Sequence, residues 1–193
     1  MVRKNRGWHP KGYFHIIVRG NNRQNIFNSK EDFQEYFKVL NYVNDRSPFE
    51  LYAYCIMTNH AHLLMRSRLV PLGEIMAPIN KRYSDYFRKK YNYVGQIYQN
   101  RYFSKEIIDS QGLLDVGAYI HRNPIETTIP MVSKMELYPY SSYQYYYDSH
   151  HRHSPHPFLK LSLLLSLLPV GTEKTAARYA KYCVDYQEER IDN

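Results

Sequence analysis

The chain has 193 residues, enough for one domain with a hydrophobic core, and a formal net charge of +8. Its two cysteines, Cys55 and Cys183, exclude a disulfide framework and fit a reducing compartment such as the cytoplasm. We find no signal peptide and no apolar run long enough to span a bilayer. The basic charge and the 21 tyrosines suit nucleic acid, although a tyrosine-rich core under a charged surface fits equally well.

The N-terminal part of the chain predicts a strand, a loop and a helix. The short apolar and β-branched run Tyr13–Arg19 predicts a strand, and the polar residues 20–25 predict a loop. Ser29 and the two acids that follow it are typical of a helix N-terminus. Apolar residues then recur at helical spacing as far as Val43.

The middle of the chain predicts two strands, a helix and a further strand. The runs Leu51–Met57 and His60–Ser67 predict two strands joined by a tight turn. Apolar residues at helical spacing from 75 to 87 predict a second helix, in which Pro78 marks a kink or a late start. A fourth strand is expected over Tyr102–Ile108. This order predicts an α+β, ferredoxin-like βαββαβ fold, with two helices on one face of an antiparallel sheet.

A further helix and a C-terminal extension are expected after the sheet. Asp109 or Ser110 would cap the helix, and Pro124 would limit it. Residues 150–157 read as a loop, with helices over Phe158–Leu168 and Thr172–Glu189. We therefore expect one domain over residues 1–149 and a helical extension over residues 150–193 that packs on it.

Two histidines one residue apart carry the most chemical information. Side chains alternate along a strand, so His60 and His62 point the same way and form half of a metal site. Asn123 offers a hard amide oxygen that suits Mg²⁺ or Mn²⁺. Tyr119 lies one helical turn before Asn123, and its phenol is a competent nucleophile at phosphorus. Four side chains could therefore gather around one divalent cation.

Purely structural interpretations of the histidines compete with the metal site. His60 and His62 alone would be explained as a hydrogen-bonded pair beside a turn. His15 shares a strand face with Arg19 and lies either near the site or in the core. His121 is expected beside the site or on the surface. A cluster of four histidines is better explained by a solvated loop than by a zinc site. Its members are His150, His151, His153 and His156.

With these residues, the chain resembles the single-tyrosine HUH (histidine, hydrophobic, histidine) transposases, especially the REP-associated tyrosine transposases of bacteria. The matching segments, in order, are FHIIVRGNNRQNIF (Phe14–Phe27), YAYCIMTNHAHLLM (Tyr52–Met65), QNRYFSKEI (Gln99–Ile107), YIHRNPI (Tyr119–Ile125) and YPYSSY (Tyr138–Tyr143). A lone HAH is a weak signal, whereas NHAHLL together with YIHRNP is specific.

The resemblance implies an activity. His60, His62 and Asn123 match the ligands of a divalent cation, Mg²⁺ or Mn²⁺, and Tyr119 matches the nucleophile. The family cleaves single-stranded DNA beside a hairpin and leaves a 5′-phosphotyrosine and a free 3′-hydroxyl. Four residues fall where the family's DNA-contacting loop lies: Arg19, Asn21, Asn22 and Arg23.

Two other functions compete with strand transfer. The first is a non-catalytic nucleic-acid-binding module on the same fold, suggested by the charge and the tyrosines. The second is a histidine-based nucleotide hydrolase; Leu64 and Arg66 occupy the next positions on the His62 face, which argues against a third histidine there. A monomer is favoured over a homodimer with exchanged tyrosine helices.

Overall fold

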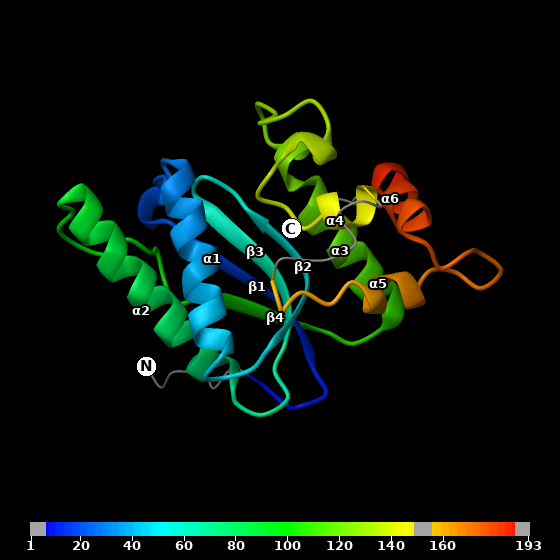
Figure 1. Cartoon of the computed structure of the whole chain (residues 1–193), viewed down its shortest axis with the longest axis horizontal. Coiled ribbons are helices and arrows are strands. Elements are labelled where there is room, and N and C mark those ends of the chain that lie inside the picture. The colour runs from blue at the N-terminus through cyan, green and yellow to red at the C-terminus, as the bar shows by residue number, and fades with distance from the viewer. Residues whose placement is uncertain (1–6, 149–155, 188–193) are drawn as a thin grey trace.

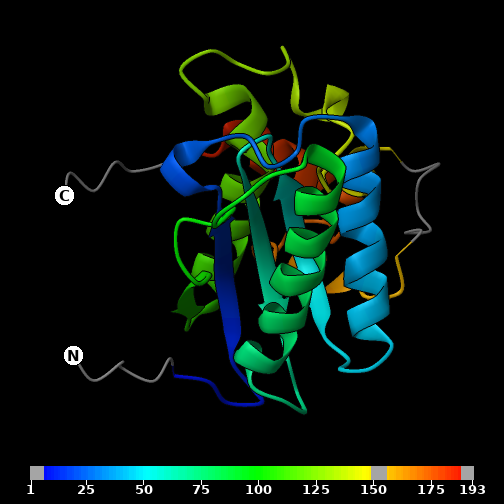
Figure 2. The same cartoon turned by 90° about the vertical axis from the view of Figure 1, so that its left-hand side faces the viewer.

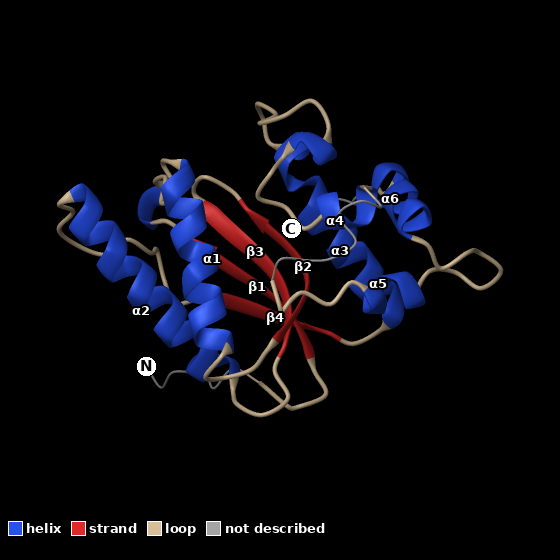
Figure 3. Ribbon diagram, in the orientation of Figure 1, coloured by secondary structure: helices blue, strands red, loops and turns tan. Residues whose placement is uncertain are grey.

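An antiparallel sheet of four strands organises residues 7–148 and 156–187, which the computed structural model describes. The strands lie in the order β2-β3-β1-β4 (Figures 1 and 3). Their bounds are β1 Tyr13–Arg19, β2 Glu50–Ile56, β3 His60–Arg66 and β4 Phe103–Ile107. This order, with every neighbouring pair antiparallel, confirms the ferredoxin-like fold class.

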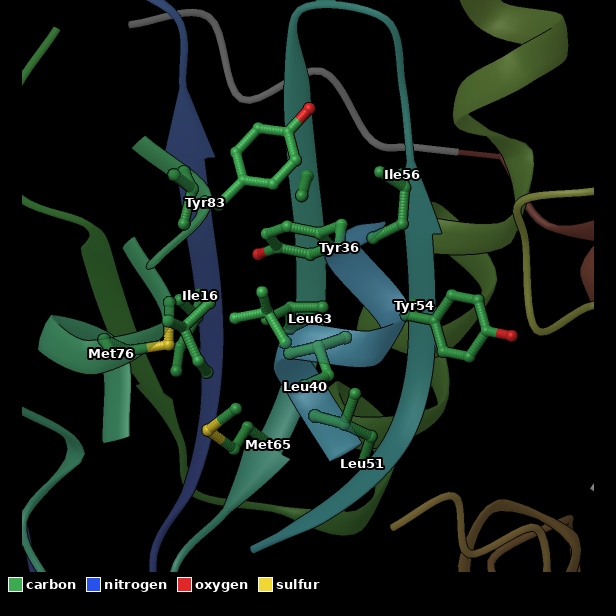
Figure 4. Packing of buried hydrophobic residues seen from close by; sticks show 14 of the residues in the cluster. Ile16, Tyr36, Leu40, Leu51, Tyr54, Ile56, Leu63, Met65, Met76 and Tyr83 are labelled. Atoms are coloured by element: carbon green, nitrogen blue, oxygen red, sulfur yellow. The ribbon is translucent and has the colours of Figure 1, made fainter. Parts of the chain in front are cut away.

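Helices α1 (Lys30–Asn44) and α2 (Leu72–Tyr91) cover one face of the sheet side by side (Figure 2). Alternate strand residues such as Ile16 and Leu63 are fully buried against them, together with Tyr36 and Tyr83 (Figure 4). We refer to this packed layer as the first core. Helix α2 begins well before Pro78, so the late start considered for this helix is wrong.

The opposite face is covered over β2 and β3 by α3 (Ser110–Glu126) and the C-terminal helices (Figure 1). The other bounds are α4 Gln144–Tyr147, α5 Ser162–Ser166 and α6 Ala176–Asp185, with 3₁₀ turns over Asn21–Arg23 and Met135–Leu137. Leu64 and Ala53 of the sheet are buried against these helices in a second core. Among the described residues, no helix is both long and apolar enough to cross a membrane.

Helix α3 passes through Pro124, so the expected limit there is wrong. Asp109 caps the helix, its side chain accepting a hydrogen bond from the Gly112 N–H at 2.7 Å. The bias of a residue before proline against helical backbone is weak, and tertiary packing outweighs it because Pro124 itself is buried. The helix ends at Thr127, where the backbone becomes extended.

The C-terminal helices are shorter than the sequence pattern predicts. Phe158 and Lys160 make backbone hydrogen bonds with Leu51 at 2.7 and 2.8 Å, so this segment extends the edge of β2 before α5 begins. Pairing with an unsatisfied sheet edge outweighs the local helical pattern. Thr175 caps α6, which begins after the expected start at Thr172 and ends at Asp185. Glu188 and Glu189, the last acids of the expected helix, lie outside the described residues.

A buried carboxylate joins α1 to α2. The Asp32 side chain is fully buried and accepts hydrogen bonds from Lys90 Nζ and Tyr91 Oη at 2.6 Å and from Tyr86 Oη at 2.9 Å. Burial alone would raise the pKa of this carboxyl, but the hydrogen bonds from Lys90, Tyr91 and the Asn28 N–H outweigh it and lower the pKa below 3.8.

We expect Asp32→Ala to lower the free energy of unfolding by about 2 kcal/mol, because Lys90 loses its buried partner while remaining partly solvated. Asp85→Ala, which removes an exposed ion pair with Lys81, is the control and should change stability little. Because the folded pKa of Asp32 is lowered, its contribution is complete above about pH 4 and is lost as the pH falls through the folded pKa. Urea denaturation at neutral and acid pH measures both effects, and equal unfolding energies for the two alanine variants would contradict this role.

Candidate active site

The two histidines of β3 lie where α3 crosses the sheet. The pairing of β1 with β3 places Arg19 opposite His60 and Ile17 opposite His62, all on the α3 side. His62 is only 1% exposed, and its ring centroid lies 4.7 Å from that of His60. The Tyr119 ring of α3 approaches His62 edge-on, with 5.5 Å between the centroids. The strand pair and the helix therefore bring these residues together.

Each histidine is held through its Nδ1 atom. His60 Nδ1 donates to Asn59 Oδ1 at 2.5 Å, since an amide oxygen can only accept. His62 Nδ1 lies 2.9 Å from His15 Nε2. Nε2 of His62 is buried and has no hydrogen-bond partner among the described residues. The arrangement fits tautomers that leave a lone pair on each Nε2, because a hydrogen bond at one ring nitrogen orients the other nitrogen toward a metal ion.

Asn123 and Tyr119 are joined across one turn of α3. Asn123 Nδ2 donates to the Tyr119 carbonyl oxygen at 2.8 Å, and the Asn123 side chain lies close enough to the His60 ring to affect its pKa. His15 contacts the tyrosine as well, with ring centroids 5.8 Å apart. The structure therefore gathers all four residues selected from the sequence, and it places His15 beside the site.

The site keeps its imidazoles neutral. Burial, and next the charge of Arg19, lower the pKa of His60 to about 4, while the neighbouring Asn123 side chain works in the opposite direction. Burial, and next Lys105, lower the pKa of His15 to about 4. Burial also lowers the pKa of His62, and His60, His15 and Arg19 add to the effect. Neutral imidazole is the form that binds a metal ion.

The donor set fits a small divalent cation. Among the described residues, no three His, Cys, Asp or Glu side chains gather in a metal-binding group. Two imidazole nitrogens and one amide oxygen therefore make up the candidate set, and the buried Nε2 of His62, without a partner, is the atom that such an ion would satisfy. A set this sparse leaves coordination positions for phosphate oxygens.

The loop after β1 is tied to the same site. Gly20 N–H donates to the Asn59 carbonyl oxygen at 2.8 Å, and Asn59 Nδ2 donates to the Arg23 carbonyl oxygen at 3.2 Å. Asn22 and Arg23 have positive φ angles of 47° and 58° and exposed side chains, whereas Arg19 and Asn21 are half-buried. All four residues proposed to contact DNA thus lie at one end of the sheet, next to His60.

The role of Asn59 was not predicted from the sequence, and neither His121 nor His156 lies in the surroundings that the sequence indicated. Asn59 stands directly before His60, and a short polar side chain in a turn is ordinary enough to hide its role. His121 is neither beside the site nor on the surface: it is fully buried, 2.7 Å from Ser142 Oγ. His156 stacks on Phe37 and Phe158, and the rest of its predicted cluster lies outside the described residues.

Comparison with known proteins identifies the class. The sequence pattern of the family "Transposase IS200 like" matches residues 9–123. The chain therefore belongs to the IS200-like transposase family and is a transposase. No protein with a curated description matches it significantly.

A solved structure supports the fold. A REP-associated tyrosine transposase bound to a REP hairpin superposes with a TM-score of 0.60 at 19% identity, covering 75% of this chain and 84% of that one. A second structure, of a Deinococcus radiodurans R1 protein assigned as a transposase, has a TM-score of 0.42 at 14% identity and covers 57% and 89% of the two chains. The first of these has the same α+β arrangement.

We expect His15, His60 and His62 to stay neutral between about pH 5 and pH 8, because burial holds their pKa values low. NMR of the imidazole ring signals against pH measures this directly, with each signal assigned by substitution. A midpoint near the ordinary histidine value of 6.5 for His60 or His62 would contradict the described burial.

Proposed function

We propose that this transposase is a metal-dependent single-stranded DNA endonuclease and strand transferase that works through a 5′-phosphotyrosine intermediate. The observation that carries the proposal is the convergence of Tyr119, His62, His60 and Asn123, which come from two elements far apart in the sequence. A non-catalytic binding module would have no need to bury two neutral imidazoles beside a tyrosine.

The tyrosine supplies the chemistry of the covalent step. The Tyr119 Oη attacks the phosphorus, the bond from phosphorus to the 3′ oxygen breaks, and the phenolic proton is lost as the 3′ oxygen gains one. The products are a 5′-phosphotyrosine and a free 3′-hydroxyl, so the phosphodiester energy is kept for rejoining. The reverse attack by another 3′-hydroxyl completes strand transfer and frees Tyr119.

His60, His62 and Asn123 would hold the divalent cation, Mg²⁺ or Mn²⁺. When bound, such an ion polarises a phosphoryl oxygen and offsets the charge that develops at phosphorus. The protein's part is orientation, because Asn59 and His15 fix the two rings and the Tyr119 carbonyl fixes the Asn123 amide.

The proposed substrate is single-stranded DNA that contains a hairpin. The solved relative was bound to a REP hairpin, and this chain is strongly basic. Arg19, Asn21, Asn22 and Arg23 would contact the DNA, with the arginines on phosphates. Tyr119 reaches the histidines of its own chain, which supports a monomer with a complete site.

We expect the wild-type protein to form a covalent adduct with labelled single-stranded hairpin DNA in Mg²⁺ or Mn²⁺, and Tyr119→Phe to form none. Denaturing gel electrophoresis separates the adduct from free DNA. Tyr147→Phe, at an exposed tyrosine, is the control and should leave the yield unchanged. An adduct that persists in Tyr119→Phe would assign the nucleophile elsewhere, and binding without any adduct would favour the non-catalytic module.

We expect Mn²⁺ binding, measured by calorimetry without DNA, to be abolished in His62→Ala and weakened in Asn123→Ala. His15→Leu should weaken it by about 10- to 100-fold, as loss of the hydrogen-bond partner of a metal-binding imidazole does. His15→Gln should bind as the wild type does, because the glutamine amide oxygen can accept from His62 Nδ1. His9→Ala, at an exposed histidine, is the control. Equal affinity in His62→Ala and wild type would remove His62 from the ligand set.

A further inference from the structure

An exposed phenylalanine lies on the sheet face beside the histidines. Phe103 of β4 pairs with Ile17 of β1, and Ile17 pairs with His62 of β3, so the three side chains form one row across the same face. Two strand spacings, about 10 Å, separate the backbones of Phe103 and His62. Phe103 is 53% exposed, although α3 buries this face over β2 and β3. A large apolar ring is thus left open to solvent next to the site.

Positive charge surrounds this ring. Arg19 lies opposite His60 and Lys105 lies opposite His15, both on the Phe103 face. Their charges contribute to the low pKa values of His60 and His15 respectively, which places them within electrostatic reach of the site. The acid of β4, Glu106, pairs with buried Phe14 on the opposite face and contacts His9.

The open surface continues into an amide-lined cavity. Ile17, Arg19 and Phe103 line a hollow of about 310 Å³ together with the loop residues Gln99, Asn100 and Arg101. The same loop residues wall a second cavity of about 600 Å³ against α2, which is also lined by Asn80 and Tyr98. The two hollows therefore adjoin along one loop.

Side-chain amides line the second cavity. Asn80, Gln96, Gln99 and Asn100 all lie on its wall. Amide side chains match the donor and acceptor edges of nucleobases.

We propose that Phe103 and the adjoining amide-lined cavity bind unpaired nucleotides that flank the scissile phosphate. One base stacks on the Phe103 ring, Arg19, Arg101 and Lys105 contact the phosphates, and a neighbouring base enters the cavity beside Asn80. This inference rests on the proposed function for the position of the scissile phosphate. Single-stranded DNA is the occupant that fits, because an open aromatic ring among cations is the arrangement that holds unpaired bases.

Fluorescence anisotropy with labelled oligo-dT, at one salt concentration, tests the stacking surface in a Tyr119→Phe background that cannot cleave. Phe103→Ala should weaken binding by about 5- to 150-fold, the range for loss of one base-stacking ring. Phe103→Tyr keeps an aromatic ring, so its affinity should stay within about twofold of that of the parent protein, the spread of neutral surface substitutions. Tyr147→Ala removes an aromatic ring of equal 53% exposure and is the matched control, with no expected change.

A spectroscopic readout tests contact directly. The chain has one tryptophan, so the change in Phe103→Trp fluorescence on adding oligo-dT is obtained by subtracting the signal of the parent protein. Quenching specific to this variant supports stacking. Unchanged fluorescence, or unchanged affinity in Phe103→Ala, would overturn it.

The cavity is tested by comparing oligo-dT, oligo-dA and oligo-dC. We expect the Tyr119→Phe protein to discriminate among them and Asn80→Ala to reduce the differences, without changing how binding depends on salt. Equal affinities in the parent protein would reject the cavity as a base-binding site. The adduct assay, made with Tyr119 present, is independent of this binding assay. If the adduct forms and Phe103→Ala binds DNA as its parent does, only this inference is rejected. If no adduct forms but Phe103→Ala binds more weakly, only the proposed chemistry is rejected.

Discussion

The site depends above all on the antiparallel register between β1 and β3. That register sets Arg19 against His60 and His15 within hydrogen-bond distance of His62. A shift of one residue would turn both β3 histidines toward α1 and α2, into the first core. The shift is prevented by the residues that alternate with them, since Ala61 and Leu63 are buried in that core. The same strands therefore stabilise the fold with one face and hold the site residues on the other.

A second constraint is the position of α3, which the C-terminal helices determine. A Cβ at Gly117 would lie 2.6 Å from Tyr179 Oη of α6, so glycine permits the close approach of the two helices. His121 of α3 also lies 3.2 Å from Tyr179 Oη and 2.7 Å from Ser142 Oγ. Within the described residues, the C-terminal segments therefore contribute no candidate ligand but position the helix that carries Tyr119. For this reason the geometry of the site depends on the C-terminal segments.

The elements that the sequence predicts well are those whose signal lies in their own residues. The short apolar runs of β1 and β3 follow this rule, and so does the spacing of Tyr119 and Asn123 on one helix. The wrong predictions arise where a contact with residues distant in the sequence determines the local structure. Pro124 remains helical because it is buried, and Phe158 pairs with Leu51 of β2. No local pattern contains those partners, and the same holds for the bond between His15 and His62.

The tyrosine content shows why composition alone leaves function open. Tyr138 Oη donates to the Ile56 carbonyl oxygen at 2.7 Å, and Tyr146 Oη donates to the Tyr52 carbonyl oxygen at 2.9 Å. These buried rings join the C-terminal segments to β2, where a phenylalanine would leave a carbonyl group unsatisfied. Much of the aromatic content is therefore structural. Position favours DNA binding instead: cations and the open Phe103 ring lie beside neutral imidazoles, on the part of the sheet that α3 leaves uncovered.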